Sequence, residues 1–380
     1  MYESLVELLS LLGDIGFQVE IVCPGHDFAG DPVWTHHGVT HQSLQPTKSL
    51  LRMPMTARLL QTAFVSAIKN HPSIIMGADR LGSVVAAMIA RFVNSPLLYY
   101  GLELPLPHQR PLSWLARMEH WSIRTADLIV TMDRHHADFI TNQTGADASR
   151  IALLPNAASG RTMSSKNDYL RKRYPASSGK VLILHAGGIG CAQQSLALAQ
   201  AAESWGSDRY LVFHAHCRME KEDYFQNFAK QMKSMTHSVL NNEPVSPEGL
   251  DEVISSSDIG IAWYDRKFLG YRADLLGLAP GKVGRYLRNG IPVIAPNLPT
   301  VKEYIDKYRC GICVDSLDQI EAAIETIMAG YELFHQNALC CYEELWQPEP
   351  YLETLKARLD KLCAPGTVKS GRRGRMAGCG

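Results

Sequence analysis

Apolar residues alternate between two spacings along this chain. Segments with apolar positions three or four residues apart, the pattern of a helix that covers a core, alternate with short unbroken apolar runs such as "SIIMGAD" and "DLIVTM". An unbroken apolar run indicates a strand that is buried on both faces, as strands of parallel sheets are. The pattern therefore predicts an α/β fold in which helices cover both faces of parallel sheets.

A polar stretch at residues 158–180, rich in Ser, Gly and basic residues, interrupts this alternation once. We interpret it as a linker with a short helix, so the chain is predicted to form two Rossmann-like domains that face each other across a cleft. The predicted parts are a first Rossmann-like domain (1–160), a second Rossmann-like domain (161–335), helices that cross back onto the first domain (336–363) and a disordered basic tail (364–380).

Net charge and cysteine content limit which partners and which cellular compartment the sequence favours. The formal net charge of the 380 residues is zero, which argues against nucleic acid as the main partner, because phosphate binding needs a basic excess. The nine Cys are scattered, and "CGIC" has no second pair at a matching distance, which favours buried thiols over zinc and a reducing cytosol over an oxidising compartment. No apolar run approaches the ~20 residues that cross a bilayer.

Residues 46–71, "PTKSLLRMPMTARLLQTAFVSAIKNH", mix four basic side chains with apolar ones. Such a stretch fits either a basic amphipathic surface that rests on anionic lipid or a core-facing helix whose cations extend to solvent. The location is therefore predicted as cytoplasmic, with peripheral attachment to the inner face of the membrane left open.

A glycine-rich turn follows the strand in "VLILHAGGIG". Gly187, Gly188 and Gly190 have no Cβ atom, so backbone N–H groups at the start of the next helix can approach an anion. The alternative is a plain strand-to-helix turn. The full dinucleotide fingerprint is absent, and no acid ends the next strand, which disfavours a dehydrogenase. His185, beside this turn, fits a structural residue or a phosphate contact.

A second candidate is "LAPGKVGRYLRNGIPVIAPNLPTVKEYI", residues 278–305. Lys282 follows Pro280-Gly281 at the start of a short helix, where its charge could neutralise a diphosphate. A later helix is expected to begin near Val301, which places Glu303 in its first turn.

The segment from Gly281 to Ile305 resembles the donor-binding segment of retaining glycosyltransferases of the GT-B fold, the family-4-like group. The matching residues are Gly281-Lys282, Tyr286, Gly290, Pro292-Val293, Pro299 and Glu303. "RTADLIVTM", "RIALLPNA" and "SSSDIGIAWYD" are similar to other segments of the family and follow in the same order. The resemblance covers most of residues 15–330.

The resemblance implies transfer of a sugar from a nucleotide-diphosphate sugar to a hydroxyl of a glycan or lipid-linked acceptor, in cell-surface polysaccharide or glycolipid assembly. It also implies retention at the anomeric carbon, with no metal and no cofactor. The predicted donor-binding residues are Gly187, Gly188, Gly190, Lys282, Arg285, Tyr286 and Glu303. The predicted catalytic residues are Asp79 and Glu103, each at the end of a strand, with a helix N-cap or a turn acid as the alternative.

Three departures from the family pattern set up a rival hypothesis. The family's two acids, eight residues apart, fall on Gly277 and Arg285, with Asp274 nearby, and "CAQQS" replaces a basic pair after the glycine turn. Guanidinium cannot accept the hydroxyls of a ribose, although it can pair with phosphate. The chain also begins in the first helix, so the first domain is expected to lack its first strand, through either a late recorded start or a shortened relative. The rival is a catalytically inactive GT-B-like binding module.

Other polar residues of the first half receive a plainer interpretation. Glu119, His135 and His136 fall in helical segments, and the pattern favours solvent-facing positions for all three.

Overall fold

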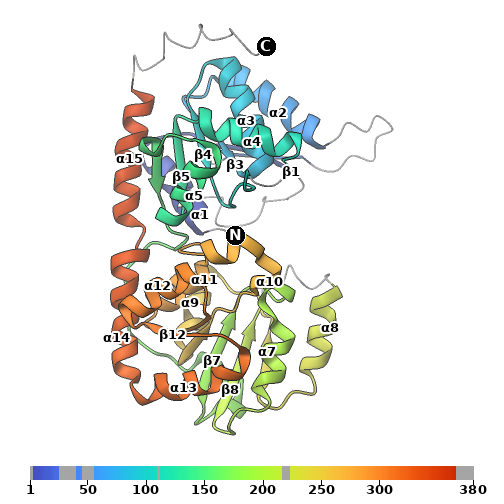
Figure 1. Ribbon diagram of the computed structural model, residues 1–380, viewed down its shortest axis with the longest axis vertical. Coiled ribbons are helices and arrows are strands. Elements are labelled where there is room, and N and C mark those ends of the chain that lie inside the picture. The colour runs from blue at the N-terminus through green and yellow to red at the C-terminus, as the bar shows by residue number, and fades with distance from the viewer. Residues whose placement is uncertain (1–2, 25–39, 45–54, 109–111, 216–222, 365–380) are drawn as a thin grey trace. The chain divides into compact units, whose positions relative to one another are not determined.

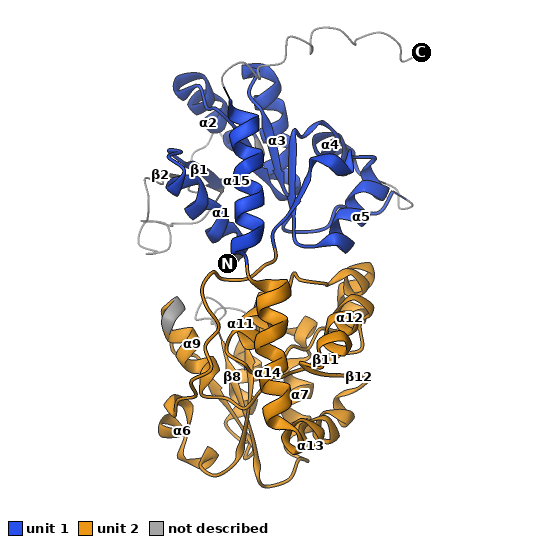
Figure 2. Cartoon of the chain, turned by 90° about the vertical axis from the view of Figure 1, so that its left-hand side faces the viewer, with its two compact units in different colours: residues 1–154, 348–380 blue, residues 155–347 orange. Residues whose placement is uncertain are grey.

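The structure is a computed structural model that describes residues 3–24, 40–44, 55–108, 112–215 and 223–364. It divides into two compact units (Figure 2). Unit 1 contains the described residues up to Leu154 and those from Pro348 on, and unit 2 contains Pro155–Gln347. In each unit the strands pair in parallel and helices pack against them, which confirms the predicted α/β class. No helix among the described residues is both long and apolar enough to span a bilayer.

Unit 1 holds two parallel sheets, one with the order β1-β2 and the other with the order β3-β4-β5-β6 (Figure 1). The elements are α1 (Glu3–Asp14), β1 (Glu20–Pro24), β2 (Thr40–Leu44), α2 (Met55–Asn70), β3 (Ile75–Ala78), α3 (Asp79–Val93), β4 (Leu97–Tyr100), α4 (Trp114–Thr125), β5 (Leu128–Thr131), α5 (Arg134–Thr144), β6 (Ile151–Leu153) and α15 (Glu349–Cys363).

Successive residues of β4 enter two different cores, as the two-residue period of a strand requires. Leu98 and Tyr100 pack in one core with leucines of α1 and with Leu355 and Leu359 of α15, so the end of the chain returns to unit 1. Tyr99 packs in the other, which α3 and α4 cover. A Cβ atom on Gly77 of β3 would lie 2.7 Å from the Cβ atom of Ala86, so only glycine permits this approach of α3.

Unit 2 contains a six-stranded parallel sheet with the order β12-β11-β10-β7-β8-β9. This is the doubly wound order, and its direction reverses between β7 and β10. The elements are α6 (Tyr169–Arg173), β7 (Val181–Ala186), α7 (Ser195–Ala202), β8 (Arg209–His214), α8 (Asp223–Met232), β9 (Ser238–Asn241), α9 (Pro247–Ser255), β10 (Ile259–Ile261), α10 (Arg266–Leu269), α11 (Gly281–Arg288), β11 (Val293–Pro296), α12 (Pro299–Tyr308), β12 (Gly311–Val314), α13 (Ile320–Ala329) and α14 (Tyr331–Cys341).

The polar segment that we interpreted as a linker is fixed to unit 2. Lys166 Nζ and Arg171 Nη2 both reach the carboxylate of Asp258, at 2.6 and 2.7 Å. Asp258 also accepts the backbone N–H of Leu182 at the start of β7. These bonds to unit 2 place the observed division at Leu154–Pro155, ahead of the polar stretch.

The structure differs from the predicted elements at β2, β9 and α12. The two strands were not predicted, because their sequences "THQSL" and "SVLN" lack a continuous apolar run. Helix α12 begins at Pro299, whose ring fixes φ at a helical value, and not near Val301. The expected position of Glu303 in the first turn is therefore wrong; this residue lies in the second turn. The predicted disordered tail lies outside the described residues.

Candidate functional site

The reversal of strand order between β7 and β10 in unit 2 creates the position where doubly wound sheets bind ligands. The loops that leave these neighbouring strands run in opposite directions, so their carboxyl ends are left open. Ala186 ends β7 and is followed by the glycine turn, and the loop with Tyr264 follows β10. The backbone N–H of Asp265 donates to Ala192 O at 2.7 Å, which ties the two loops together.

The glycine turn brings Lys282 to this position. Gly187 has a φ of +119°, and its N–H donates to His214 O at 2.9 Å. A Cβ atom there would lie 3.4 Å from Cε and 3.5 Å from Nζ of Lys282, so the lysine side chain lies against the bare backbone of the turn. Gly188 and Gly190 lie beside the side chain of Gln193. The fold thus brings Lys282 to the three glycines, although they lie more than 90 positions apart in the sequence.

Lys282 is a half-buried cation at the second residue of α11. Its Nζ lies 3.5 Å from Nε2 of His185 and 5.5 Å from the ring centre of Tyr264. Among the described residues no carboxylate lies within ion-pair distance of it. His185 Nε2 is 3.1 Å from Gly188 O, which can only accept, so we infer that this nitrogen carries a proton and gives Lys282 no acceptor.

The position of Lys282 changes its proton affinity. Burial without a neighbouring carboxylate disfavours the ammonium form and lowers the pKa of Lys282 to about 7. Burial and the adjacent lysine hold the pKa of His185 well below its usual range, so this imidazole is neutral at neutral pH. An anion at the glycine turn would give Lys282 a negatively charged partner and would therefore favour its protonated form.

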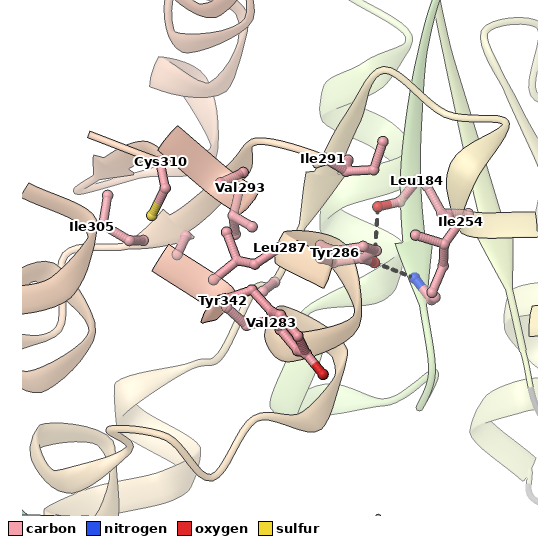
Figure 3. Packing of buried hydrophobic residues seen from close by; sticks show 14 of the residues in the cluster. Leu184, Ile254, Val283, Tyr286, Leu287, Ile291, Val293, Ile305, Cys310 and Tyr342 are labelled. Atoms are coloured by element: carbon pink, nitrogen blue, oxygen red, sulfur yellow. Dashed lines mark hydrogen bonds between the residues drawn. The ribbon is translucent and has the colours of Figure 1, made fainter. Parts of the chain in front are cut away.

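Tyr286 lies in the core of unit 2, where it supports the start of the glycine turn (Figure 3). Its side chain is fully buried, and its hydroxyl accepts the N–H of Ala186 at 2.7 Å and donates to Leu184 O at 3.1 Å. The ring lies against Gly260 of β10, where a Cβ atom would come within 2.5 Å of it. Tyr286 therefore fixes α11 to both strands at the switch point and positions the glycine turn.

Arg285, also predicted to bind the donor, is 8% exposed and points into unit 2. Its Nη1 lies 3.2 Å from Oδ1 of Asp251 on α9. The same carboxylate accepts from Arg288 at 3.3 Å and from Asn289 at 3.2 Å. This geometry favours a structural role, in which Arg285 holds α11 to α9, over direct phosphate contact. Asp274, near the expected acid position, pairs with Arg266.

The remaining predicted residues lie on other elements than this cluster. Glu303 is exposed on α12. Asp79 and Glu103 belong to unit 1: Asp79 directly follows β3, and Glu103 lies three residues beyond β4, so both are at the carboxyl edge of that sheet. The N-cap alternative for Asp79 is wrong, since Ala78 is the N-cap and no side chain caps the helix. Asp79 instead has a φ of +55°, a strained conformation that recurs at functional sites.

The solvent-facing interpretation fails for two residues of unit 1. Glu119 is 3% exposed and receives a 2.7 Å hydrogen bond from Nε of Arg80, the residue after Asp79. His136 is buried beside Asp133, with 3.2 Å between Nδ1 and Oδ1. Burial first, and then the charges of Glu119 and Asp79, raise the pKa of the Tyr99 phenol. Sequence periodicity gave no signal for the Arg80–Glu119 pair.

The described residues contain no cluster of three or more His, Cys, Asp or Glu side chains arranged to hold a metal ion. Two of the four basic side chains in residues 46–71, Lys48 and Arg52, lie outside the described residues. Sequence reasoning missed Tyr264, because the segment "DIGIAWYD" was interpreted as a strand to its end, whereas the strand ends at Ile261 and Tyr264 lies in the loop that follows.

Comparison with known domain families assigns both halves of the chain. Residues 3–157 match the model of the glycosyl transferase 4-like domain, and residues 212–343 match that of the glucosyltransferase 3-like C-terminal domain. The chain belongs to the GT-B glycosyltransferases. This assignment confirms the resemblance found in the donor segment. No curated protein matches the glycosyltransferase by sequence.

Solved structures share the fold of this glycosyltransferase over nearly its whole length. HepE of Anabaena, crystallised with UDP, is 14% identical with a TM-score of 0.69, and the match covers 94% of this chain and 96% of HepE. Sucrose-phosphate synthase of Thermosynechococcus elongatus is 14% identical with a TM-score of 0.71, covering 94% and 92%. WaaG, a glycosyltransferase involved in lipopolysaccharide biosynthesis, is 12% identical with a TM-score of 0.62, covering 95% of each chain.

Proposed function

We propose that this glycosyltransferase moves a sugar from a nucleotide-diphosphate sugar to a hydroxyl of a glycan or lipid-linked acceptor, in the assembly of cell-surface polysaccharide or glycolipid. The observation that carries the proposal is the half-buried Lys282 ammonium, which has no carboxylate partner among the described residues and lies against the Gly187 backbone at the switch point. The UDP and UDP-glucose complexes of HepE and the role of WaaG in lipopolysaccharide biosynthesis support it.

The proposed chemistry relies on electrostatic stabilisation of the leaving diphosphate by groups that the fold already positions. Cleavage of the bond between sugar and diphosphate develops negative charge on the leaving oxygen, which the ammonium of Lys282 and the N–H groups of the glycine turn would stabilise. Tyr286 and Arg285 would hold α11 so that Lys282 keeps its position. Asp79 and Glu103 stay predictions for the catalytic acids of the acceptor-side unit, and Glu303 for a donor contact.

Retention at the anomeric carbon, independence from metals and cofactors, and a cytoplasmic location with peripheral attachment to the membrane are also part of the proposal. Turnover assays that follow the anomeric configuration of the product by NMR, with and without a chelator, test the first two. An inverted product would overturn retention, and loss of turnover with the chelator would overturn independence from metals.

The direct test of donor binding is a thermal-shift panel of the full chain with UDP, GDP, ADP and CMP. A ligand that binds only the native state raises the Tm by mass action. We expect a selective shift with one nucleoside diphosphate, which identifies the base of the donor. A well-folded sample that shifts with none of them would favour the rival, a GT-B-like binding module without catalytic activity.

The affinity for the diphosphate should fall as the pH rises above 7. The pKa of Lys282 is about 7 in the free protein, so the ammonium is present below this pH and is lost above it. Binding of the anion above pH 7 requires proton uptake by Lys282, and the apparent affinity should fall toward about tenfold per pH unit. Calorimetric titration with UDP between about pH 7 and pH 9, where the phosphates are fully ionised, measures the slope.

The matched control for this titration is Lys282→Arg. Guanidinium stays protonated throughout this range, so the profile of the variant should be flat. Equal slopes in the two proteins would contradict the assignment to Lys282.

A further inference from the structure

Helix α11, which carries Lys282, contains two glycines among its eight residues. Glycine weakens a helix more than any residue except proline, so a glycine inside a helix calls for a packing reason. Gly281, Gly284 and Arg288 follow each other at spacings of three and four residues, which places them on one face of α11. The segments that cover this face of α11 supply the packing reason.

The chain passes between the two units twice, and a segment of unit 2 lies next to each passage (Figure 2). Residues 155–163 directly follow the first passage, and residues 342–347 directly precede the second. We call them the first and second crossing segments. The second begins with a π-helix, Tyr342–Trp346. The hydroxyl of Tyr342 donates to Ala158 O at 2.6 Å, which ties the two segments to each other.

The first crossing segment contacts α11 at both of its ends. At the start, the buried Asn156 donates from Nδ2 to Ala279 O at 2.8 Å. A Cβ atom on Gly281 would lie 3.1 Å from the same Nδ2, so the helix begins directly against this amide. At the end, the N–H of Met163 donates to Arg288 O at 2.8 Å. Asn156 therefore fixes the backbone that leads directly into Lys282.

The second crossing segment contacts α11 in its middle. A Cβ atom on Gly284 would lie 2.8 Å from Cε3 of Trp346 and 3.3 Å from the Cβ atom of Ala157. Trp346 is fully buried, and its ring meets that of Tyr304 edge-on with 5.9 Å between the centroids. The indole therefore has little room to move away, and α11 keeps its position because residue 284 has no side chain.

We propose that the two crossing segments position Lys282 for the donor diphosphate through their contacts with α11, with Asn156 and Trp346 as positioning residues. A group that stabilises a developing charge must be held closely, since a displacement of about 1 Å can cost about two orders of magnitude in rate. The proposal rests on the proposed function for the identity of the anion. The position of Lys282 itself can be measured without any ligand.

The variant Gly284→Ala tests the proposal in two ways. Without ligand, acetylation by acetic anhydride over a series of pH values, measured at Lys282 by mass spectrometry, gives the pH at which this amine loses its proton. Because burial lowers the pKa of Lys282 to about 7, displacement of α11 should move this midpoint upward, toward that of an exposed lysine. Calorimetric titration with UDP should show binding at least about tenfold weaker than that of the parent.

The compensating variant combines Gly284→Ala with Trp346→Phe. The phenyl ring lacks the outer indole atoms that the added methyl group would meet, so the pair should regain the parent midpoint and UDP affinity. Asn156→Ala adds no volume and should shift both quantities in the same direction as Gly284→Ala. The control is Ile324→Ala on α13, which removes a buried side chain from the other core of unit 2. It should lower the Tm and leave both quantities unchanged.

The outcomes separate this proposal from the proposed function. A parent midpoint at Lys282 in both Gly284→Ala and Asn156→Ala would overturn the positioning role, whether or not UDP binds. So would a compensating variant no closer to the parent than Gly284→Ala, or a control that shifts the midpoint as much. The expected midpoints, in a parent protein that binds no nucleoside diphosphate, would count against the proposed function alone.

Discussion

Replacement of Lys282 by Met should lower kcat/KM for the nucleotide sugar by about two to three orders of magnitude. Met keeps much of the length of the side chain and removes the only cation that lies against the glycine turn among the described residues. The leaving diphosphate would then develop its charge in a half-buried position without a compensating cation, where electrostatic interactions are stronger than in bulk water. Steady-state kinetics with the donor identified by the thermal-shift panel measure the effect.

The control for this variant is Lys302→Met. Lys302 is exposed on α12 and pairs with Asp306 at 2.7 Å, so its removal should leave kcat/KM unchanged. Lys282→Met should also have a Tm at least as high as that of the parent, because burial disfavours the charged form of Lys282 and its charge therefore contributes no stability. Full turnover by Lys282→Met would show that the diphosphate lies elsewhere.

The replacement Asp251→Ala should lower the free energy of unfolding by about 3–5 kcal/mol. Asp251 is buried on α9, and its carboxylate accepts from Arg285, Arg288 and Asn289. Its removal takes a carboxylate partner away from the buried guanidinium of Arg285, and breaking a buried ion pair from one side is strongly destabilising. Because α11 carries Lys282, donor affinity should fall together with stability. Urea denaturation measures the first quantity and nucleotide titration the second.

Asp306→Ala provides the comparison for stability. This residue forms an ion pair within α12 in which both side chains are exposed, and its loss should cost less than about 1 kcal/mol. Equal effects of the two substitutions would mean that the Asp251 network contributes no more than a surface ion pair.

The sequence alone determined the layered architecture and singled out the glycine turn and Lys282, which meet where the strand order of unit 2 reverses. Unbroken apolar runs such as that of β7 can be buried only between helices, so the parallel α/β class follows from local pattern. Gly187 and Lys282 were identifiable from local sequence. A glycine turn after a strand exposes backbone N–H groups to an anion, and a lysine near a helix start adds a positive charge. Strands β2 and β9 escaped prediction because neighbouring strands, and not their own composition, hold them in place.

Only the tertiary structure decided what each side chain contacts. Arg285 and Tyr286 follow each other in the donor segment, yet one pairs with Asp251 and the other bonds to β7, because successive residues of a helix point about 100° apart. The nearness of Lys282 to His185 depends on strand order, which brings together positions far apart in the chain. Its lowered pKa follows from burial and the absence of a nearby carboxylate, and both are properties of the packed fold that no local pattern contains.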